Sequence, residues 1–379
     1  MTIKFKSEAY NDAKQKLSNA YASGDVTAQG EALTNFVDAM KDEVSATILQ
    51  KVQNENADNS ILASRGQNVL TSNELKFFNA VVEQGGFTTE ETLPVTTQER
   101  IFEDLTKEHP LLAALGLQNM GAVTRYIYSD PSLNYAWGEL FGDIKGQVNA
   151  SFRSEQVGTL KLTAFAAIPK DMVALGPVWV ENYVRTLLVE SYSVGLEYGF
   201  VNGNGITEPL GLTKDKAENG AVTDKVSSGT LTFAPSERGQ VIVKELHGVV
   251  SALSVDSKGK QRKVLNNIVM VVNPIDAIAI QARNTIQTAT GQWVTALPYN
   301  IQVVESEEVP LKKAIFFVKG CYNAALTGGY TINKYDQILA FEDANLYTIK
   351  QFANGRAKDN KSALVYDLNI DFDADPAGA

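Results

Sequence analysis

An Asn-Gly repeat at residues 202–205 has the residue types of a phosphate-binding loop. Such a loop lies between a strand and the first turn of a helix, where backbone N–H groups point at the anion. This repeat instead follows a long amphipathic pattern that begins at Gly176-Pro177. Glycine and asparagine tolerate the positive φ angles that end a helix. The repeat therefore predicts a helix end and not a nucleotide site.

Acidic and amide side chains recur at every second position near residue 370, a spacing that could serve a cation. They are Asp367, Asn369, Asp371, Asp373 and Asp375. Alternate residues of a strand share one face, and apolar residues would occupy the other. An EF-hand loop needs an internal glycine and a closing glutamate, and neither is present. The spacing indicates a solvated strand face, with a weak cation between subunits as the alternative.

Histidine and cysteine are too scarce for a metal or nucleophile site of the usual kind. His109 precedes a proline and His247 lies in an expected helix, without metal-ligand spacing. Cys321 follows an apolar run and is expected to be a small buried side chain, and a single cysteine suits a reducing compartment. The sequence has no GxSxG, HExxH or Walker pattern. We therefore predict no metal, no cofactor and no catalytic residues.

Three glutamates, Glu305, Glu307 and Glu308, could supply a general acid and a general base. They follow a short strand pattern, and we interpret them as an acidic turn. The alternative is a soluble carboxylate-dependent hydrolase, which would need a deep pocket with convergent acidic residues.

The composition is that of an ordinary soluble protein with a large core. The chain has 379 residues, a hydrophobic fraction of 44% and a formal net charge of −10. This length suits two or three domains. No run of eighteen apolar residues occurs and no apolar region follows the basic N-terminal residues, so neither a transmembrane helix nor a secretory signal is expected. No basic stripe indicates sequence-specific nucleic-acid binding.

Proline divides the sequence into two parts. Residues 1–93 contain no proline, and the rest of the chain contains all eleven. In the first part, apolar residues at helical spacing predict helices from Ala13 to Tyr21, from Ala32 to Val52 and from Thr71 to Gly85. Thr71 or Ser72 is expected to cap the third helix, and residues 54–59 are expected to form a polar turn.

The rest of the chain alternates strand and helix patterns, which suggests a central sheet covered by helices. Helices are predicted over 97–106, 110–116, 177–202, 240–253 and 274–283, and strands over 123–129, 160–168, 267–272, 301–304, 314–318 and 337–341. Residues 347–352 and 363–372 are predicted to pair, with Asn354-Gly355 near the turn. Residues 130–159 have no sustained apolar face and are predicted to form a projecting two-stranded ribbon.

The order of these elements, over about three quarters of the chain from Thr92 to Phe372, resembles that of the tailed-phage major capsid protein family. The resemblance rests on the passages TLPVTTQERIFEDLTKEHPLLAAL, Leu160–Leu212 ending in NGNGITEPLGL, IVMVVNPIDAIAI, LPYNIQVVESEEVP and AIFFVKGCYNAAL, and more on their order than on any one of them. It implies an α+β tailed-phage major capsid fold. That fold has an axial domain, a peripheral domain with a long spine helix, an extended loop and a helical N-terminal arm.

The resemblance also implies a division of the chain. The expected segments are a helical N-terminal arm or scaffold-like segment (1–91), the start of the peripheral domain (92–129), the extended loop (130–159), the peripheral domain with its spine helix (160–205), the axial domain (206–334), and peripheral strands with the C-terminal tail (335–379).

The implied function is that of a major capsid protein, which is not an enzyme. It would self-assemble in the host cytoplasm into hexamers and pentamers of an icosahedral phage head, the virion capsid, around double-stranded DNA. The implied partners are other copies of itself, a portal, and a scaffold or maturation protease. Packaged DNA would be near the shell without specific contacts, and no membrane is involved. An encapsulin-like nanocompartment shell is the alternative within the fold, although such shells usually lack so long a helical N-terminal segment.

Some members of this family join subunits by an isopeptide bond between a lysine of the extended loop and an asparagine of a neighbouring peripheral domain. Lys145 lies near the place of such a lysine, between Gly142 and Gly146, and Asn345 and Asn354 are the candidate acceptors. Lysine in a glycine-rich loop is common, and most family members do not crosslink. Non-covalent assembly is therefore the favoured interpretation.

Overall fold

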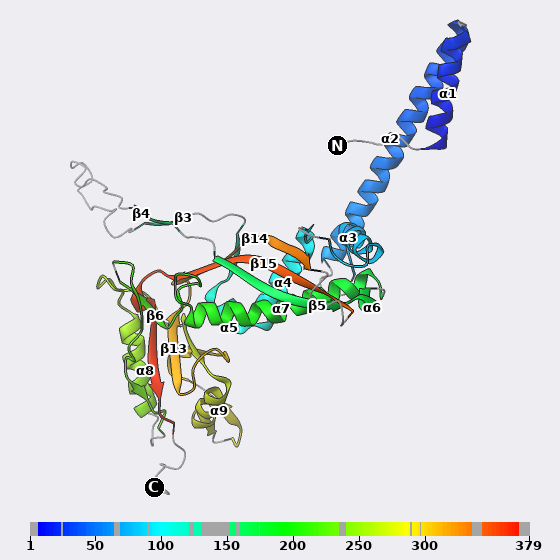
Figure 1. Cartoon of the computed structure of the whole chain (residues 1–379). Coiled ribbons are helices and arrows are strands. Elements are labelled where there is room, and N and C mark those ends of the chain that lie inside the picture. The colour runs from blue at the N-terminus through cyan, green and yellow to red at the C-terminus, as the bar shows by residue number, and fades with distance from the viewer. Residues whose placement is uncertain are drawn as a thin grey trace, which may run out of the picture. The chain divides into compact units, whose positions relative to one another are not determined.

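The computed structural model describes residues 7–23, 26–63, 69–88, 91–120, 125–129, 152–156, 160–173, 175–217, 219–234, 240–288, 290–295, 297–335 and 343–370. They belong to two compact units, Met1–Ala80 and Val81–Ala379 (Figure 1). The smaller unit is helical, and the larger one contains two five-stranded sheets with helices. This mixture of helix and sheet is the α+β class that the sequence predicted.

The N-terminal unit is built on an antiparallel pair of helices. α1 (Glu8–Ser23) and α2 (Val26–Ala63) lie side by side (Figure 1), and the rings of Tyr10 and Phe36 pack between them with centroids 5.3 Å apart. The predicted turn at residues 54–59 is wrong, because α2 continues through it. That stretch is polar, but it contains no glycine or proline that would break a helix.

The third helix begins as its capping residues predict. α3 (Ser72–Glu83) follows Thr71, whose N–H donates to Glu74 Oε2 at 2.9 Å, while the Glu74 N–H donates to Thr71 Oγ1 at 3.4 Å. These reciprocal bonds form a capping box and satisfy two backbone donors that the first turn leaves unpaired. The chain leaves the helix through Gly85, whose φ of 68° suits a residue without a Cβ.

The first sheet of the larger unit, which we call the peripheral sheet, has the order β1, β14, β15, β5, with β2 also paired to β14. Its strands are β1 (Glu91–Thr92), β2 (Gln118–Met120), β5 (Leu160–Pro169), β14 (Tyr322–Tyr335) and β15 (Ala344–Ala357), and the associated helices are α4 (Val95–Glu108), α5 (Pro110–Leu115), α6 (Lys170–Val173) and α7 (Pro177–Asn202). The helix α7 packs along β5 and β15 and corresponds to the expected spine helix (Figure 1).

The long helix α7 is fixed to the sheet by apolar packing and by one buried hydroxyl. Leu188 is fully buried and Leu187 is half-buried. The hydroxyl of Tyr192 donates to the carbonyl of Ile349 on β15 at 2.7 Å. Burial, together with the neighbouring Tyr330, raises the pKa of Tyr192, so this hydroxyl stays protonated and keeps donating.

A buried ion cluster joins α7 to α4. Glu181 is inaccessible to solvent, and its Oε1 lies 3.1 Å from Arg185 Nε and 3.5 Å from Arg100 Nη1. Arg185 also pairs with Asp104 on α4. Burial alone would lower the pKa of Arg185, but Glu181 and Asp104 outweigh it and raise that pKa. The guanidinium of Arg185 therefore stays charged, as a buried ion does when it is paired and hydrogen-bonded.

The second sheet, which we call the axial sheet, has the order β12, β9, β13, β16, β8. Its strands are β8 (Thr230–Leu231), β9 (Ile268–Val272), β12 (Gln302–Glu305), β13 (Lys313–Val318) and β16 (Ala363–Leu368), and its helices are α8 (Gln240–Leu253) and α9 (Pro274–Arg283). α8 contacts β13 and β16, whereas α9 contacts the edge strand β12. The predicted helices over 240–253 and 274–283 and the strand ending at Val272 are confirmed with bounds within one residue.

The strands after residue 320 differ from the sequence prediction. Residues 363–368 pair with β13 and not with residues 347–352, and Asn354 and Gly355 lie inside β15 and not in a turn. β14 was not predicted as a strand, and it belongs to the peripheral sheet although residues 206–334 were expected to be axial. Conversely, β16 joins the axial sheet although residues 335–379 were expected to be peripheral. The predicted strand at 337–341 lies outside the described residues.

The described part of the larger unit also contains three short two-stranded ribbons. The pairs are β3 (Arg125–Ser129) with β4 (Phe152–Gln156), β6 (Lys214–Lys216) with β7 (Val222–Asp224), and β10 (Thr285–Gln287) with β11 (Trp293–Thr295). The first pair forms the base of the predicted extended loop, of which residues 130–151 lie outside the described ranges. Among the helices that the structure describes, none combines the length and apolar character needed to cross a membrane.

Candidate functional site

The Asn-Gly repeat at residues 202–205 forms the end of α7, as predicted. Asn204 Oδ1 accepts hydrogen bonds from the backbone N–H groups of Ile206 at 2.8 Å, Thr207 at 2.9 Å and Glu208 at 3.2 Å. A Cβ on Gly203 would lie 2.3 Å from the carbonyl oxygen of Gly199. The glycine is therefore needed for a close backbone approach, and these N–H groups are occupied by the protein itself and not directed at an anion.

The alternating acidic residues lie only partly within the described part of the chain. Asp367 is on β16, where its carboxylate lies 3.5 Å from Lys313 Nζ. A hydrogen bond from Ser227 and the charge of Lys313 lower the pKa of Asp367. Asp371, Asp373 and Asp375 fall outside the described residues. Within the described ranges, no group of three or more histidine, cysteine or carboxylate side chains could hold a metal ion.

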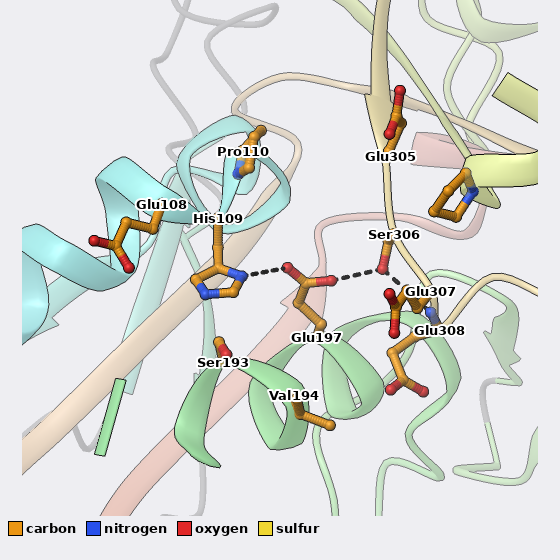
Figure 2. Close-up of a pocket in the computed structure, with 11 residues that line it drawn as sticks. Glu108, His109, Pro110, Ser193, Val194, Glu197, Glu305, Ser306, Glu307 and Glu308 are labelled. Carbon is orange, nitrogen blue, oxygen red and sulfur yellow. Dashed lines mark hydrogen bonds and ion pairs between the residues drawn. The ribbon is translucent and has the colours of Figure 1, made fainter. Parts of the chain in front are cut away.

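The three turn glutamates line a cavity of about 340 Å³ (Figure 2). The cavity is bounded by the start of α5, the middle of α7, the turn after β12 and Pro274 at the start of α9. Its acidic lining residues are Glu108, Glu197, Glu305, Glu307 and Glu308. Acidic residues therefore do converge in the monomer, which is the feature that the hydrolase alternative required.

The bonds inside this cavity do not form a nucleophilic relay. His109 Nδ1 lies 3.3 Å from Glu197 Oε1, and Ser306 Oγ donates to Glu197 Oε2 at 2.6 Å (Figure 2). In a serine hydrolase the histidine contacts the serine and the carboxylate contacts the histidine. Here the carboxylate lies between the other two, so the histidine cannot take the serine proton. Glu197 instead ties α5 to the turn after β12.

The same turn is bonded to α7, which packs on the peripheral sheet, and to β9 of the axial sheet, so it forms a joint between them. Asn202 Nδ2 at the end of α7 donates to the carbonyl of Glu308 at 2.7 Å, and the N–H of Ser306 donates to the carbonyl of Val272 on β9 at 3.0 Å. Burial and the nearby Glu197 and Glu307 raise the pKa of Glu308. Sequence reasoning found the turn but missed Glu197, whose partners are 88 and 109 residues away along the chain.

Of the residues predicted for a crosslink, the structure describes the two asparagines. Asn345 is 2% exposed on β15, and its Nδ2 lies 3.3 Å from the Tyr347 hydroxyl. Asn354 is half-buried on the same strand. Lys145, Gly142 and Gly146 lie outside the described residues.

Among the described residues, neither Cys321 nor His247 belongs to a group that could hold a metal ion. Cys321 is half-buried beside the axial core and not fully buried as expected, because it follows Gly320 in the turn between β13 and β14. His247 lines a groove on the outer side of α8.

Comparison with known families identifies the chain. A profile of the phage capsid family matches residues 89–320, more than half of the sequence. The chain belongs to the phage capsid family. It is therefore a structural protein of the phage capsid and not an enzyme.

A search of curated proteins finds no match for this phage capsid protein. Solved structures similar to it include capsids and an encapsulin. The capsid of a native GTA particle shares 14% identity at a TM-score of 0.45, covering 75% of this chain and 93% of that one. The procapsid of satellite phage P4 shares 9% identity (TM-score 0.43; coverage 80% and 99%). The SrpI encapsulin of Synechococcus elongatus PCC 7942 shares 11% identity (TM-score 0.39; coverage 77% and 95%).

Proposed function

We propose that this capsid protein assembles in the host cytoplasm into hexamers and pentamers whose shell encloses double-stranded DNA. The observation that carries the proposal is the family match over residues 89–320, which includes α7 and most of the axial sheet. Contacts around such rings are heterologous and close because the rotation closes. The net charge of −10 lets the shell hold DNA without binding it tightly.

Electron microscopy of the purified full-length protein tests this proposal. Closed shells with five-fold and six-fold capsomers support it, and a discrete monomer or dimer contradicts it. The encapsulin-like alternative is separated from the phage head by what the shell contains. Nuclease-protected double-stranded DNA in particles from infected or induced cells supports a phage head, whereas a co-purifying protein cargo without DNA supports a nanocompartment.

Sheet membership supports redrawn domain bounds. We assign residues 160–205 and 322–357 to the peripheral domain, because α7, β5, β14 and β15 pack together. Residues 206–320 and 358–370 form the axial domain, because β16 returns to β13. Residues 1–91 remain the N-terminal arm, 92–129 the lead into the peripheral domain, and 130–159 the extended loop.

The first 75 or so residues of the N-terminal arm direct assembly and are not part of the core of the larger unit. Its support is an apolar row on α2 that stays exposed beside α1, including Leu33, Val37 and Ile48. A protein starting at Thr88 should still melt cooperatively but assemble poorly or into irregular sizes. Loss of the cooperative transition would instead show that the arm is an integral layer. A scaffold or maturation protease and a portal are the further partners of this stage.

The extended loop joins subunits by non-covalent contacts. Replacing residues 142–151 with a Gly/Ser linker keeps the β3–β4 base, so the subunit should fold but form few stable shells. Normal yields of intact particles would contradict this role. The covalent alternative requires Lys145, with Asn354 as the more accessible acceptor, since Asn345 is buried. Particles that run as single subunits on a denaturing gel support non-covalent assembly, and a ladder that disappears in Lys145→Ala supports the crosslink.

A further inference from the structure

The outer side of α8 carries a groove with a floor of small residues. The groove has a volume of about 560 Å³, and its lining includes His247, Gly248, Ser251, Ala252 and Lys361. Gly248, Ser251 and Ala252 have i, i+3, i+4 spacing, so they lie in one row on the helix surface. A Cβ on Gly248 would meet no atom within 4 Å. The groove is therefore open enough to receive side chains from outside the subunit.

A ridge of large aliphatic side chains lies on a different flank of the same domain. Ile275 and Ile278, one turn apart on α9, are 66% and 68% exposed. Leu311 is 56% exposed and precedes Lys312, whose N–H donates to Asp276 Oδ2 at 2.7 Å, so it lies beside the first turn of α9. α9 contacts β12 at one edge of the axial sheet, and α8 contacts β13 and β16 (Figure 1).

The groove and the ridge carry opposite charge. The charged or chargeable residues that line the groove are His247 and Lys361. Beside the ridge, Pro274 at the start of α9 lines the acidic cavity together with Glu305 and Glu307, both of which are exposed. One chain thus presents an apolar ridge with Glu305 and Glu307 along one side and Lys312 beside Leu311, and a groove bordered by Lys361 and His247. Complementary charge of this kind steers association and fixes register.

The geometry points to a head-to-tail contact between copies of this chain, which rests on the proposed capsomers. In it, Ile275, Ile278 and Leu311 of one subunit enter the α8 groove of the next, and the two glutamates beside the ridge face Lys361 and His247. Rows of side chains on one helix pack into the grooves of another, and small residues in the groove allow close approach. Because the two halves lie on different flanks, the contact repeats around a ring.

Variants that fill the groove or charge the ridge test the contact. Gly248→Leu places a large side chain in the groove at a position where a Cβ meets no atom of its own subunit, and Ile278→Asp places a charge on the ridge. Neither should lower the melting temperature of the unassembled subunit, and both should reduce shell yield at least tenfold in electron microscopy and sedimentation. Gly248→Ala is the matched control in the groove. Ile206→Asp, at an exposed isoleucine outside the ridge, is the matched control for charge, and both controls should assemble normally.

A mixing experiment then tests the head-to-tail geometry. Ile278→Asp keeps an intact groove and Gly248→Leu keeps an intact ridge, so an equimolar mixture should give one-to-one dimers that cannot close into rings. Lys361→Glu should lower shell yield, and adding Glu307→Lys to the same chain should restore part of it.

Four results would overturn the contact: normal shells from Gly248→Leu, equal loss in Ile206→Asp, no dimer in the mixture, or an unchanged yield in Lys361→Glu. Failure of the wild-type protein to form shells would count against the proposed function instead.

Discussion

The axial and peripheral sheets bury their strands differently. All five residues of β9 are buried, as are the last five of β13. In β5 of the peripheral sheet, alternate residues such as Ala164 and Ala166 are buried, whereas Phe165 between them is 68% exposed. The central strands β9 and β13 of the axial sheet are thus covered on both faces. The edge strand β5 of the peripheral sheet packs one face against α7 and leaves Phe165 at the surface of the other, whereas β14 and β15 beside it are mostly buried.

This difference indicates two roles within one subunit, which are stability of the fold and contact with other subunits. Strands buried on both faces stabilise the subunit strongly, because nearly every one of their side chains is part of the core. An edge strand covered on one face, such as β5, is stabilised mainly by the helix that lies on it. The exposed face of β5 remains available for contacts with other subunits. Four sets of substitutions test how far this contrast holds.

The largest effect is expected where α7 packs on the peripheral sheet. Leu188→Asp places an unpaired charge at a fully buried position, which costs several kcal/mol and approaches the whole stability of a domain. The variant should be insoluble or unfolded. The half-buried neighbour Leu187 is the matched control, and Leu187→Asp should remain folded with a lower melting temperature. A soluble Leu188→Asp protein with the wild-type melting temperature would show that α7 is not what holds this sheet.

A pair of phenylalanine substitutions compares the two sheets directly. Phe316 is fully buried in β13 against Tyr366, with ring centroids 5.6 Å apart, so Phe316→Ala should lower the free energy of unfolding by about 3–5 kcal/mol. Phe165→Ala in the exposed face of β5 should change it by less than about 0.5 kcal/mol. Denaturant titration of unassembled subunits measures both. Equal losses would mean that the open face of β5 is covered within the subunit.

A glycine substitution tests the packing between α7 and β15. A Cβ on Gly355 would lie 2.4 Å from the Tyr322 hydroxyl and 2.6 Å from Phe200 Cε1. Gly355→Ala should therefore destabilise the subunit by about 1–3 kcal/mol through overpacking. Gly248→Ala, in the open groove of α8, should instead stabilise it by about 0.5–1 kcal/mol, because alanine is the better helix former. A Gly355→Ala variant with the wild-type free energy of unfolding would show that the peripheral sheet tolerates local repacking.

The smallest effect is expected at the joint between the sheets. The pKa of Glu308 is raised in the folded chain, so the folded state binds this proton more tightly than the unfolded state does. Its carboxylate therefore costs stability as pH rises through the folded pKa, and the cost is absent below about pH 4. Glu308→Gln should be more stable than wild type at neutral pH by less than about 1 kcal/mol, because solvent screens this half-buried group. A difference that persists at pH 3.5 would assign the effect to packing.

The sequence predicted the axial sheet better than the peripheral one for a physical reason. Strands buried on both faces read as continuous apolar runs, and Pro274 marks the start of α9. In β14, by contrast, Gly328 has a φ of 73° at a bulge and interrupts the strand pattern. The Asn354-Gly355 pair carries a local turn signal, but Gly355 is needed for the approach of Tyr322 and Phe200.

The acidic cavity could be predicted only in part, because sequence patterns report on residues that are close together in the chain. Its three turn glutamates were visible as a cluster, because they are neighbours in the sequence. Glu197 reads as one polar residue on an amphipathic helix, and its bonds to His109 and Ser306 exist only after the chain has folded. The assembly surfaces are harder still, because Ile275 and Ile278 read as ordinary core positions of α9 until their exposure is known.

The path of the chain between the sheets has a consequence for synthesis. β5 pairs with β15, so Pro169 cannot pair until Ala344, 175 residues later, has been synthesised. At about 5–20 residues per second, translation of that interval takes about 10–35 s. In the axial sheet, β8 pairs with β16, so Thr230 pairs with Asp367, 137 residues later. Neither sheet can close before these strands have left the ribosome. The topology thus keeps a nascent chain from joining a shell and separates synthesis in time from assembly.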